Sequence, residues 1–205
     1  MDKNRLEAFS DGVFAIAITL LIIEVHVPEV EDGGLATALA QQWPSYAAYL
    51  VSFTVIGIIW INHHRILAYV AQVDRPLLFL NLMLLLFVAA IPFPTALLAK
   101  YINAGWPDAN VAAAVYSGGA VGVALSFNLL WRWIVRDARL LHAHIDVNVL
   151  RGFTRRFSLG LLVYPVALAL SFISAPATLA LHGLVAVFYV FDQVSQRGGV
   201  DEAAP

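Results

Sequence analysis

The sequence predicts an all-α integral membrane protein, and three observations carry this prediction. First, 60% of the 205 residues are hydrophobic and only 13% are charged, which gives a mean hydropathy of +0.78. A soluble domain of this length cannot bury so much apolar surface. Second, six apolar segments each approach the roughly 20 residues that cross a bilayer core as a helix. Third, almost all basic residues fall on one side of these segments.

The six predicted spans form a single domain over residues 1–192. Their approximate ranges are 8–27, 39–61, 76–98, 109–135, 157–174 and 177–191. Pro92 and Pro94 should bend the third span, because proline removes a backbone hydrogen bond. Only Ala175 and Pro176 separate the last two spans, which predicts an antiparallel hairpin with proline in the first turn of the sixth helix. The polar segment 193–205 is expected to be a disordered cytoplasmic tail.

The basic residues predict the orientation of the spans. With the N-terminus inside, all 12 lysines and arginines except Lys100 fall in the inner segments. The outer segment from Pro28 to Gln42 carries acidic residues and no basic one. This asymmetry places both termini in the cytoplasm.

A polar group at the base of the first span needs partners. Ser10 and Asp11 lie at its inner edge, where a carboxylate facing lipid is costly. The second span ends at the same depth with Trp60, Asn62 and His63, whose side chains can all donate hydrogen bonds. We therefore predict a hydrogen-bonded cluster of these five residues. The alternative is that Ser10 and Asp11 only face water at the end of the helix, without specific partners.

An apolar stripe follows this polar group. Ile16, Thr19, Leu20, Ile23 and Val27 are spaced by steps of mostly three or four residues, which puts them on one helical face. From spacing alone, the commonest interpretation of such a stripe is an ordinary lipid-facing or core surface.

Three motifs resemble the transmembrane protein 175 family of potassium channels. They are Arg5-x-x-x-Phe9-Ser10-Asp11 at the start of the first span, WINHH at 60–64 and IPFPT at 91–95. The number of spans and the orientation are also similar. A single six-helix unit resembles the prokaryotic branch, which implies a homotetramer in the cell membrane of a prokaryote, with helix one lining a central pore.

The resemblance implies roles for residues of the first span. Ile16, Leu20 and Ile23 match the pore constrictions, with the tightest ring at Ile16, and Thr19 matches a polar lining position. The chain has no Thr-Val-Gly-Tyr-Gly filter, so selection between ions would rest on the cost of removing hydration water. Such a pore would favour potassium modestly over sodium. The implied hydrogen-bond network at the base of helix one comprises Arg5, Phe9, Ser10, Asp11, Trp60, Asn62 and His63.

Acidic residues near the outer mouth would concentrate cations. They are Glu24, Glu29, Glu31 and Asp32. For Glu24, a satisfied helix-end carboxylate is an equally good interpretation. Potassium is expected only as the permeant ion, with no cofactor and no metal site. The expected partners are further copies of the chain and membrane lipid; nucleic acid is not expected, because the basic residues are dispersed.

Other functions fit the sequence less well. A secondary transporter of cations or small solutes is the main alternative, but it requires charges at the membrane midplane and interrupted helices in paired halves. An enzyme is disfavoured because His63 and His64 have no nucleophile with an orienting partner. Zinc binding by His142, His144 and Asp146 is disfavoured because this spacing does not share one helical face. Segment 136–152 is either an extension of the fourth span or an amphipathic piece on the membrane surface.

Overall fold

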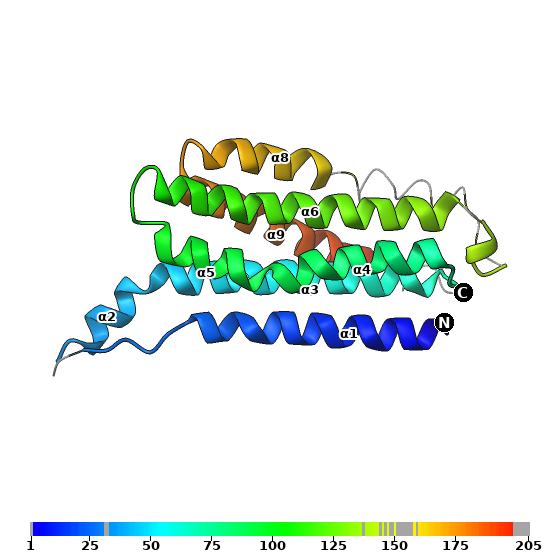
Figure 1. Cartoon of the computed structure of the whole chain (residues 1–205), viewed down its shortest axis with the longest axis horizontal. Helices are drawn as coiled ribbons and strands as arrows, with labels where there is room; N and C mark the ends of the chain where they lie inside the picture. The colour runs from blue at the N-terminus through cyan, green and yellow to red at the C-terminus, as the bar shows by residue number, and fades with distance from the viewer. Residues whose placement is uncertain are drawn as a thin grey trace.

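The computed structural model is an all-helical bundle in the part of the chain that it describes, which confirms the predicted fold class (Figure 1). The described residues are 2–30, 33–136, 138–143, 145, 147, 150, 158 and 160–198, with side chains up to Phe191. The helices are α1 (Lys3–Leu20), α2 (Leu35–Gln41), α3 (Trp43–Ala68), α4 (Arg75–Ala90), α5 (Pro92–Tyr101), α6 (Asp108–Arg136), α8 (Gly160–Ser171) and α9 (Ala175–Gly198). Short 3₁₀ turns follow α1 at Leu21–Glu24 and α6 at Ala138–Leu140.

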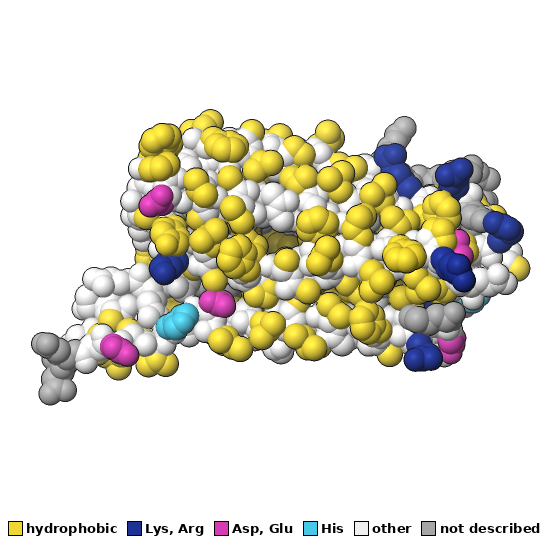
Figure 2. Space-filling view, in the orientation of Figure 1, with side chains coloured by type: hydrophobic (Ala, Val, Ile, Leu, Met, Phe, Trp, Pro, Cys, Tyr) yellow, Lys and Arg dark blue, Asp and Glu magenta, His cyan; other side chains and the backbone are white. Residues whose placement is uncertain are grey.

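Four helical units are long and apolar enough to cross a membrane. They cover Lys3–Glu24, Trp43–Ala68, Arg75–Tyr101 and Asp108–Arg136, and the shorter apolar helices Gly160–Ser171 and Ala175–Phe191 follow. The long axes of these helices run roughly parallel along the bundle (Figure 1). In Figure 2, hydrophobic side chains cover most of the visible length, whereas Lys and Arg side chains gather mainly at the end that holds both termini.

Several boundaries differ from the predicted spans. The first helical unit ends at Glu24 rather than Val27, since Val25 already has extended backbone; Pro28 also disfavours helical backbone at Val27. The third span consists of two helices, α4 and α5, that meet at Ile91 beside Pro92. The short helix α2 covers part of the predicted outer loop and the first residues of the predicted second span, which begins at Trp43 instead of residue 39. At the C-terminus, α9 continues through residues 193–198, so this part of the predicted tail is helical; residues 199–205 lie outside the described residues.

Side-chain caps define where some helices begin. Asp2 accepts a hydrogen bond from the backbone N–H of Asn4 at 3.4 Å, and Asp74 accepts one from the N–H of Leu77 at 2.9 Å. Such caps satisfy donors that the first helical turn leaves free. Asp74 also accepts from the indole N–H of Trp133, 3.2 Å from each carboxylate oxygen. The start of α4 is therefore tied to the end of α6.

α6 is the central helix of the bundle and packs against α4, α5, α8 and α9. Its residues Leu130, Trp131 and Ile134 are fully buried in a core shared with α1, α3 and α4. Gly118 and Gly122 form a Gly-x-x-x-Gly pair on this helix, and of the two Gly122 makes the close approach. A Cβ atom there would lie 2.3 Å from a ring carbon of Phe87, whereas a Cβ at Gly118 would meet nothing within 4 Å.

We expect Gly122→Ala to lower the free energy of unfolding by about 1–3 kcal/mol, because the new methyl group forces the ring of Phe87 out of its place. Gly118→Ala is the matched control on the same helix. It should leave stability unchanged or raise it by up to about 1 kcal/mol, since alanine favours helix. The thermal midpoint of the purified protein measures both changes. Equal midpoints for the two variants would contradict the close contact.

Candidate functional site

Helix α1 has a buried face and an exposed face. The buried residues pack toward α3 and α4, with which α1 makes most of its helix contacts; they are Leu6, Ser10, Phe14, Ala17 and Leu21. α1 lies at the edge of the bundle (Figure 1), so its other face has no covering helix within the described part of one chain.

The predicted constriction residues lie on the exposed face. Ile16 is 62% exposed, Leu20 41% and Ile23 65%. Thr19 is also exposed, and its hydroxyl group lies 2.9 Å from the backbone oxygens of both Ala15 and Ile16. Because that hydroxyl donates within its own helix, its two lone pairs are available to a solvent molecule or an ion. A face this apolar on a helix that spans a membrane needs either lipid or another subunit to cover it.

The stripe does not keep one helical geometry along its whole length. Ile16, Thr19 and Leu20 belong to the α-helix, whereas Ile23 lies in the 3₁₀ turn Leu21–Glu24. A 3₁₀ turn has 3.0 residues per turn instead of 3.6, so the direction of Ile23 differs from the one that uniform α-helical spacing predicts. Val27 is 88% exposed and lies beyond the turn, outside the helical stripe.

The base of α1 is joined to α3 and α4 by side-chain hydrogen bonds. The indole N–H of Trp60 donates to Oδ1 of Asp11 at 2.8 Å, where both residues are exposed. On the buried side, the Ser10 hydroxyl donates to the carbonyl of Leu6 at 2.8 Å and accepts from the Asn81 amide at 3.0 Å. Oδ1 of Asn81 then lies 2.7 Å from Nε2 of His63. The ring of His63 also contacts Phe14, with 5.3 Å between the ring centroids.

Asn81 is a member of this cluster that sequence reasoning missed. It is fully buried and connects Ser10 to His63, so that polar groups of α1, α4 and α3 satisfy one another. Its signal in the sequence is a lone amide inside the apolar run LLFLNLMLLL. A buried amide in a membrane helix must find partners, because lipid offers none.

Other predicted network members lie elsewhere in the single chain. Asn62 lies on the wall of an interior cavity with Phe127 and Asn128. Phe9 is 52% exposed and shares the exposed face with Ile16. Arg5 is exposed as well, and within the described residues its guanidinium group has no ion-pair partner. The structure therefore brings together Ser10, His63 and Asn81 on one side of the base of α1, and Asp11 and Trp60 on the other.

Two of the four predicted outer-mouth carboxylates are among the described residues. Glu24 is half-buried at the end of the 3₁₀ turn, and Glu29 is exposed. The backbone oxygen of Glu24 contacts the ring of His26 at 2.9 Å. Glu31 and Asp32 lie outside the described residues.

A second polar network lies inside the bundle, and the sequence did not predict it. The Ser52 hydroxyl is 2.8 Å from that of Thr95 and 3.0 Å from that of Tyr116, which connects α3, α5 and α6. The Ser117 hydroxyl is 3.1 Å from Nε2 of His182 on α9. These hydrogen bonds join neutral hydroxyl groups and one imidazole, and they contain none of the carboxylate or ammonium groups that a midplane transport site would use.

The segment after α6 turns back toward the end of α3 instead of continuing the helix. α6 ends at Arg136, and Leu140 accepts hydrogen bonds from the N–H groups of Ala71 and Gln72 at 2.7 and 3.2 Å. The N–H of His142 donates to the carbonyl of Tyr69 at 3.1 Å. His144 and Asp146, of the disfavoured zinc trio, lie outside the described residues. Among the residues that the structure does describe, no group of three His, Cys, Asp or Glu side chains is placed to hold a metal ion.

Comparison with known proteins identifies the family of this chain. The family described as "Endosomal/lysosomal potassium channel TMEM175" matches residues 5–92, the stretch that contains α1, α3 and α4. A protein of Streptomyces collinus, named as a potassium channel, is 54% identical over 194 residues, which cover 94% of each chain. This chain belongs to the TMEM175 family. A second TMEM175 relative, a potassium channel of Chamaesiphon minutus, is 44% identical over 92% of this chain and 93% of its own length.

A solved TMEM175 structure has the same fold. It is the crystal structure of a lysosomal potassium-selective channel TMEM175 homolog from Chamaesiphon minutus. It superposes with a TM-score of 0.83 and 42% sequence identity over 93% of this chain and 97% of that chain. The TMEM175 relatives are named as ion channels, and the family is not one of enzymes. Family membership thus agrees with the interpretation of His63 as part of a structural cluster.

Proposed function

We propose that this protein is a potassium channel that conducts passively, with a modest preference for potassium over sodium. Its functional form is a homotetramer in which the exposed faces of four α1 helices line the pore. The observation that carries this proposal is the exposure of Ile16 and Leu20 on the face of α1 that the described part of the chain leaves uncovered, and of Ile23 in the 3₁₀ turn that follows. The names of the close relatives support potassium as the permeant ion.

The pore would select ions through their hydration. Rings of aliphatic side chains at Ile16 and Ile23 offer no ligand, and the carbonyl groups along α1 are used within the helix. An ion must therefore pass with a compressed or partly removed hydration shell, and potassium releases water more readily than sodium. Narrowing of the same rings would also stop conduction by dewetting. The hydroxyl of Thr19, repeated in each subunit, would partly replace lost water between the two rings.

Acidic groups and the polar cluster have supporting roles in this proposal. Glu24 and Glu29, with Glu31 and Asp32, would raise the cation concentration at the outer mouth. At the opposite end, the bonds from Asp11 and Ser10 to α3 and α4 would fix the rotation of α1, so that Ile16 faces the axis. Arg5 and Phe9 would complete this network across the contact between subunits, since both are exposed in the single chain.

We also infer that both termini are cytoplasmic and that the channel lies in the cell membrane of a prokaryote. The gathering of basic side chains at the end that holds both termini supports this orientation (Figure 2), since basic residues are retained on the cytoplasmic side. The relatives from Streptomyces and Chamaesiphon support a prokaryotic membrane.

Recordings from the purified protein in planar bilayers test the proposal. Under opposed potassium and sodium gradients, we expect a reversal potential nearer to the potassium equilibrium potential, and discrete single-channel steps. A reversal potential near zero would contradict potassium selectivity. Flux without unitary steps, at the slow turnover of a carrier, would favour the secondary transporter instead.

A further inference from the structure

Two adjoining cavities lie inside the subunit, in the part of the bundle opposite α1. Residues of α3, α4, α5, α6, α8 and α9 line them, and their volumes are about 50 and 70 Å³. The two cavities share Val55, Ile59, Val123 and Tyr164 as lining residues, so they meet at a common wall. Each is several times larger than the roughly 10–15 Å³ that one water-sized probe requires.

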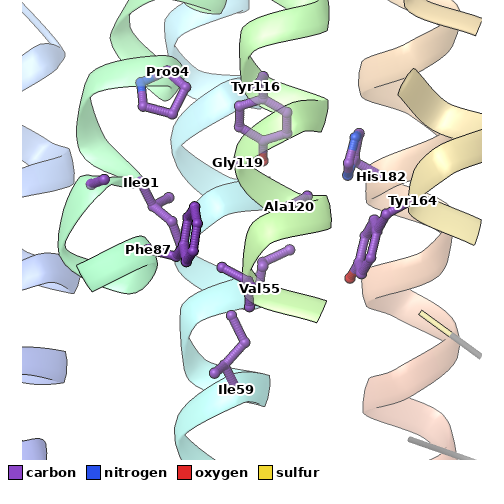
Figure 3. Close-up of a pocket in the computed structure, with 12 residues that line it drawn as sticks. Val55, Ile59, Phe87, Ile91, Pro94, Tyr116, Gly119, Ala120, Tyr164 and His182 are labelled. Atoms are coloured by element: carbon purple, nitrogen blue, oxygen red, sulfur yellow. The ribbon is translucent and has the colours of Figure 1, made fainter. Parts of the chain in front are cut away.

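The walls of these cavities are mainly apolar, although the amide groups of Asn62 and Asn128 lie on the wall of the second cavity. Figure 3 shows Phe87, Ile91 and Pro94 on one side of the first cavity, with Tyr164 and His182 facing them from the other. Within the described residues, no Asp, Glu, Lys or Arg side chain lines either space. Largely apolar cavities of this size accept small apolar guests. A charged guest would lose its hydration without gaining a counter-charge.

One polar group on the shared wall is the hydroxyl of Tyr164. Tyr164 stacks on the ring of His182, with 5.5 Å between centroids and an interplanar angle of 18°. Its hydroxyl has no hydrogen bond to any residue that the structure describes. The neighbouring polar groups are already engaged, because His182 pairs with Ser117 at 3.1 Å and Tyr116 with Ser52 at 3.0 Å. An unused hydroxyl beside an apolar space fits a guest that carries one hydroxyl of its own.

We propose that the paired cavities bind one small, neutral amphiphile, a phenol or short-chain alcohol that arrives through the membrane. Its hydroxyl pairs with that of Tyr164, and its apolar part lies between Val55 and Phe87. The site is internal to each subunit and separated from the exposed face of α1 by α3. It is therefore distinct from the proposed conduction path, and its occupancy is measurable without any current.

Two probes test the site in the full-length, purified protein. Xenon, introduced under pressure into crystals, shows an apolar cavity through its anomalous scattering. 4-Fluorophenol tests binding that depends on a hydroxyl group, because its fluorine NMR signal changes when it binds. Phenol without fluorine serves as the competitor. We expect a xenon peak between Val55 and Tyr164 and saturable binding of 4-fluorophenol. Tyr164→Phe should keep the xenon peak. It should raise the dissociation constant of 4-fluorophenol by about 2- to 10-fold, which is the effect expected from the loss of one hydrogen bond.

Filling the cavity should remove both signals. Ala120→Leu places a larger side chain into the first cavity and should abolish the xenon peak and the binding of 4-fluorophenol. The matched control is Val115→Leu, an exposed position on the same helix, which should change neither signal. If Ala120→Leu fails to fold, Tyr164→Phe alone decides the outcome, because it removes one oxygen atom and leaves the volume of the side chain almost unchanged. Absence of xenon from both cavities, or 4-fluorophenol binding that Tyr164→Phe leaves unchanged, would overturn the proposal.

Discussion

Replacement of Ile16 by asparagine is expected to raise sodium permeability relative to potassium by about three- to tenfold, equivalent to about 0.6–1.4 kcal/mol of lost discrimination. In the proposed tetramer, this change puts four amide groups where the aliphatic ring was. Amide oxygens replace hydration water, so the cost of dehydration falls for both ions. It falls more for sodium, because sodium holds its water more tightly. Reversal potentials under opposed gradients measure the change.

Two further variants distinguish an effect on the constriction at Ile16 from a general disturbance of the protein's structure. Ile16→Val keeps an aliphatic ring and should keep the permeability ratio within experimental error. Ile173→Asn makes the same chemical change at another isoleucine, one that is 79% exposed and lies between α8 and α9. It should leave the ratio unchanged. If Ile16→Asn has the same reversal potential as the unmodified protein, the constriction lies elsewhere along the chain.

The polarity pattern along the chain was enough to predict much of the fold. Six apolar segments, two proline positions and one asymmetric set of basic residues correspond to the helices, to the junction at Ile91 and to the charged end of the bundle. These features depend on local hydropathy and backbone chemistry, which a single sequence contains. The helical extension of α9 to Gly198 was missed, because polar residues beyond a span look the same whether or not they continue its helix.

Contacts between helices were harder to predict than the helices. Trp60 donates to Asp11 across 49 residues of sequence, and both residue types suggested that pairing. Asn81 reaches Ser10 across 71 residues, and Ser52 reaches Tyr116 across 64. Such pairs depend on the rotation of each helix about its axis, which no local pattern specifies. An isolated serine or threonine in an apolar helix is also uninformative, because it can bond to its own backbone, as Thr19 does.

Replacement of Asp11 by alanine is expected to abolish potassium current or to prevent tetramer formation. The change removes the acceptor of the 2.8 Å bond from Trp60, a bond to a charged group that is worth about 1.5–3 kcal/mol when shielded from water. Both residues are exposed in the single chain, so the effect on the subunit alone should be near the lower end. The larger effect should fall on assembly, because a rotation of α1 displaces the whole stripe from Ile16 to Ile23.

Three variants assign the effect of Asp11→Ala to this hydrogen bond. Asp11→Asn keeps an oxygen acceptor for the indole N–H and should retain tetramers, whereas Trp60→Phe removes the donor and should reproduce most of the loss. If the two side chains act only through this hydrogen bond, the double variant Asp11→Ala/Trp60→Phe should lose no more current or tetramer than the more damaging single variant. Glu7→Ala is the control, since it removes the 3.6 Å ion pair with Lys3 on the same helix and should leave current intact.

The readouts are the oligomeric state in detergent and the current in planar bilayers. Unmodified protein and Glu7→Ala should run as tetramers and conduct, while Asp11→Ala should do only one of these or neither. If Asp11→Ala formed tetramers and conducted like the unmodified protein, Asp11 would be only a solvated residue at the end of the helix. This is the alternative that its position in the sequence leaves open. The buried hydrogen bonds from Ser10 through Asn81 to His63 would then fix the rotation of α1, since they connect α1 to α4 and α3 without Asp11.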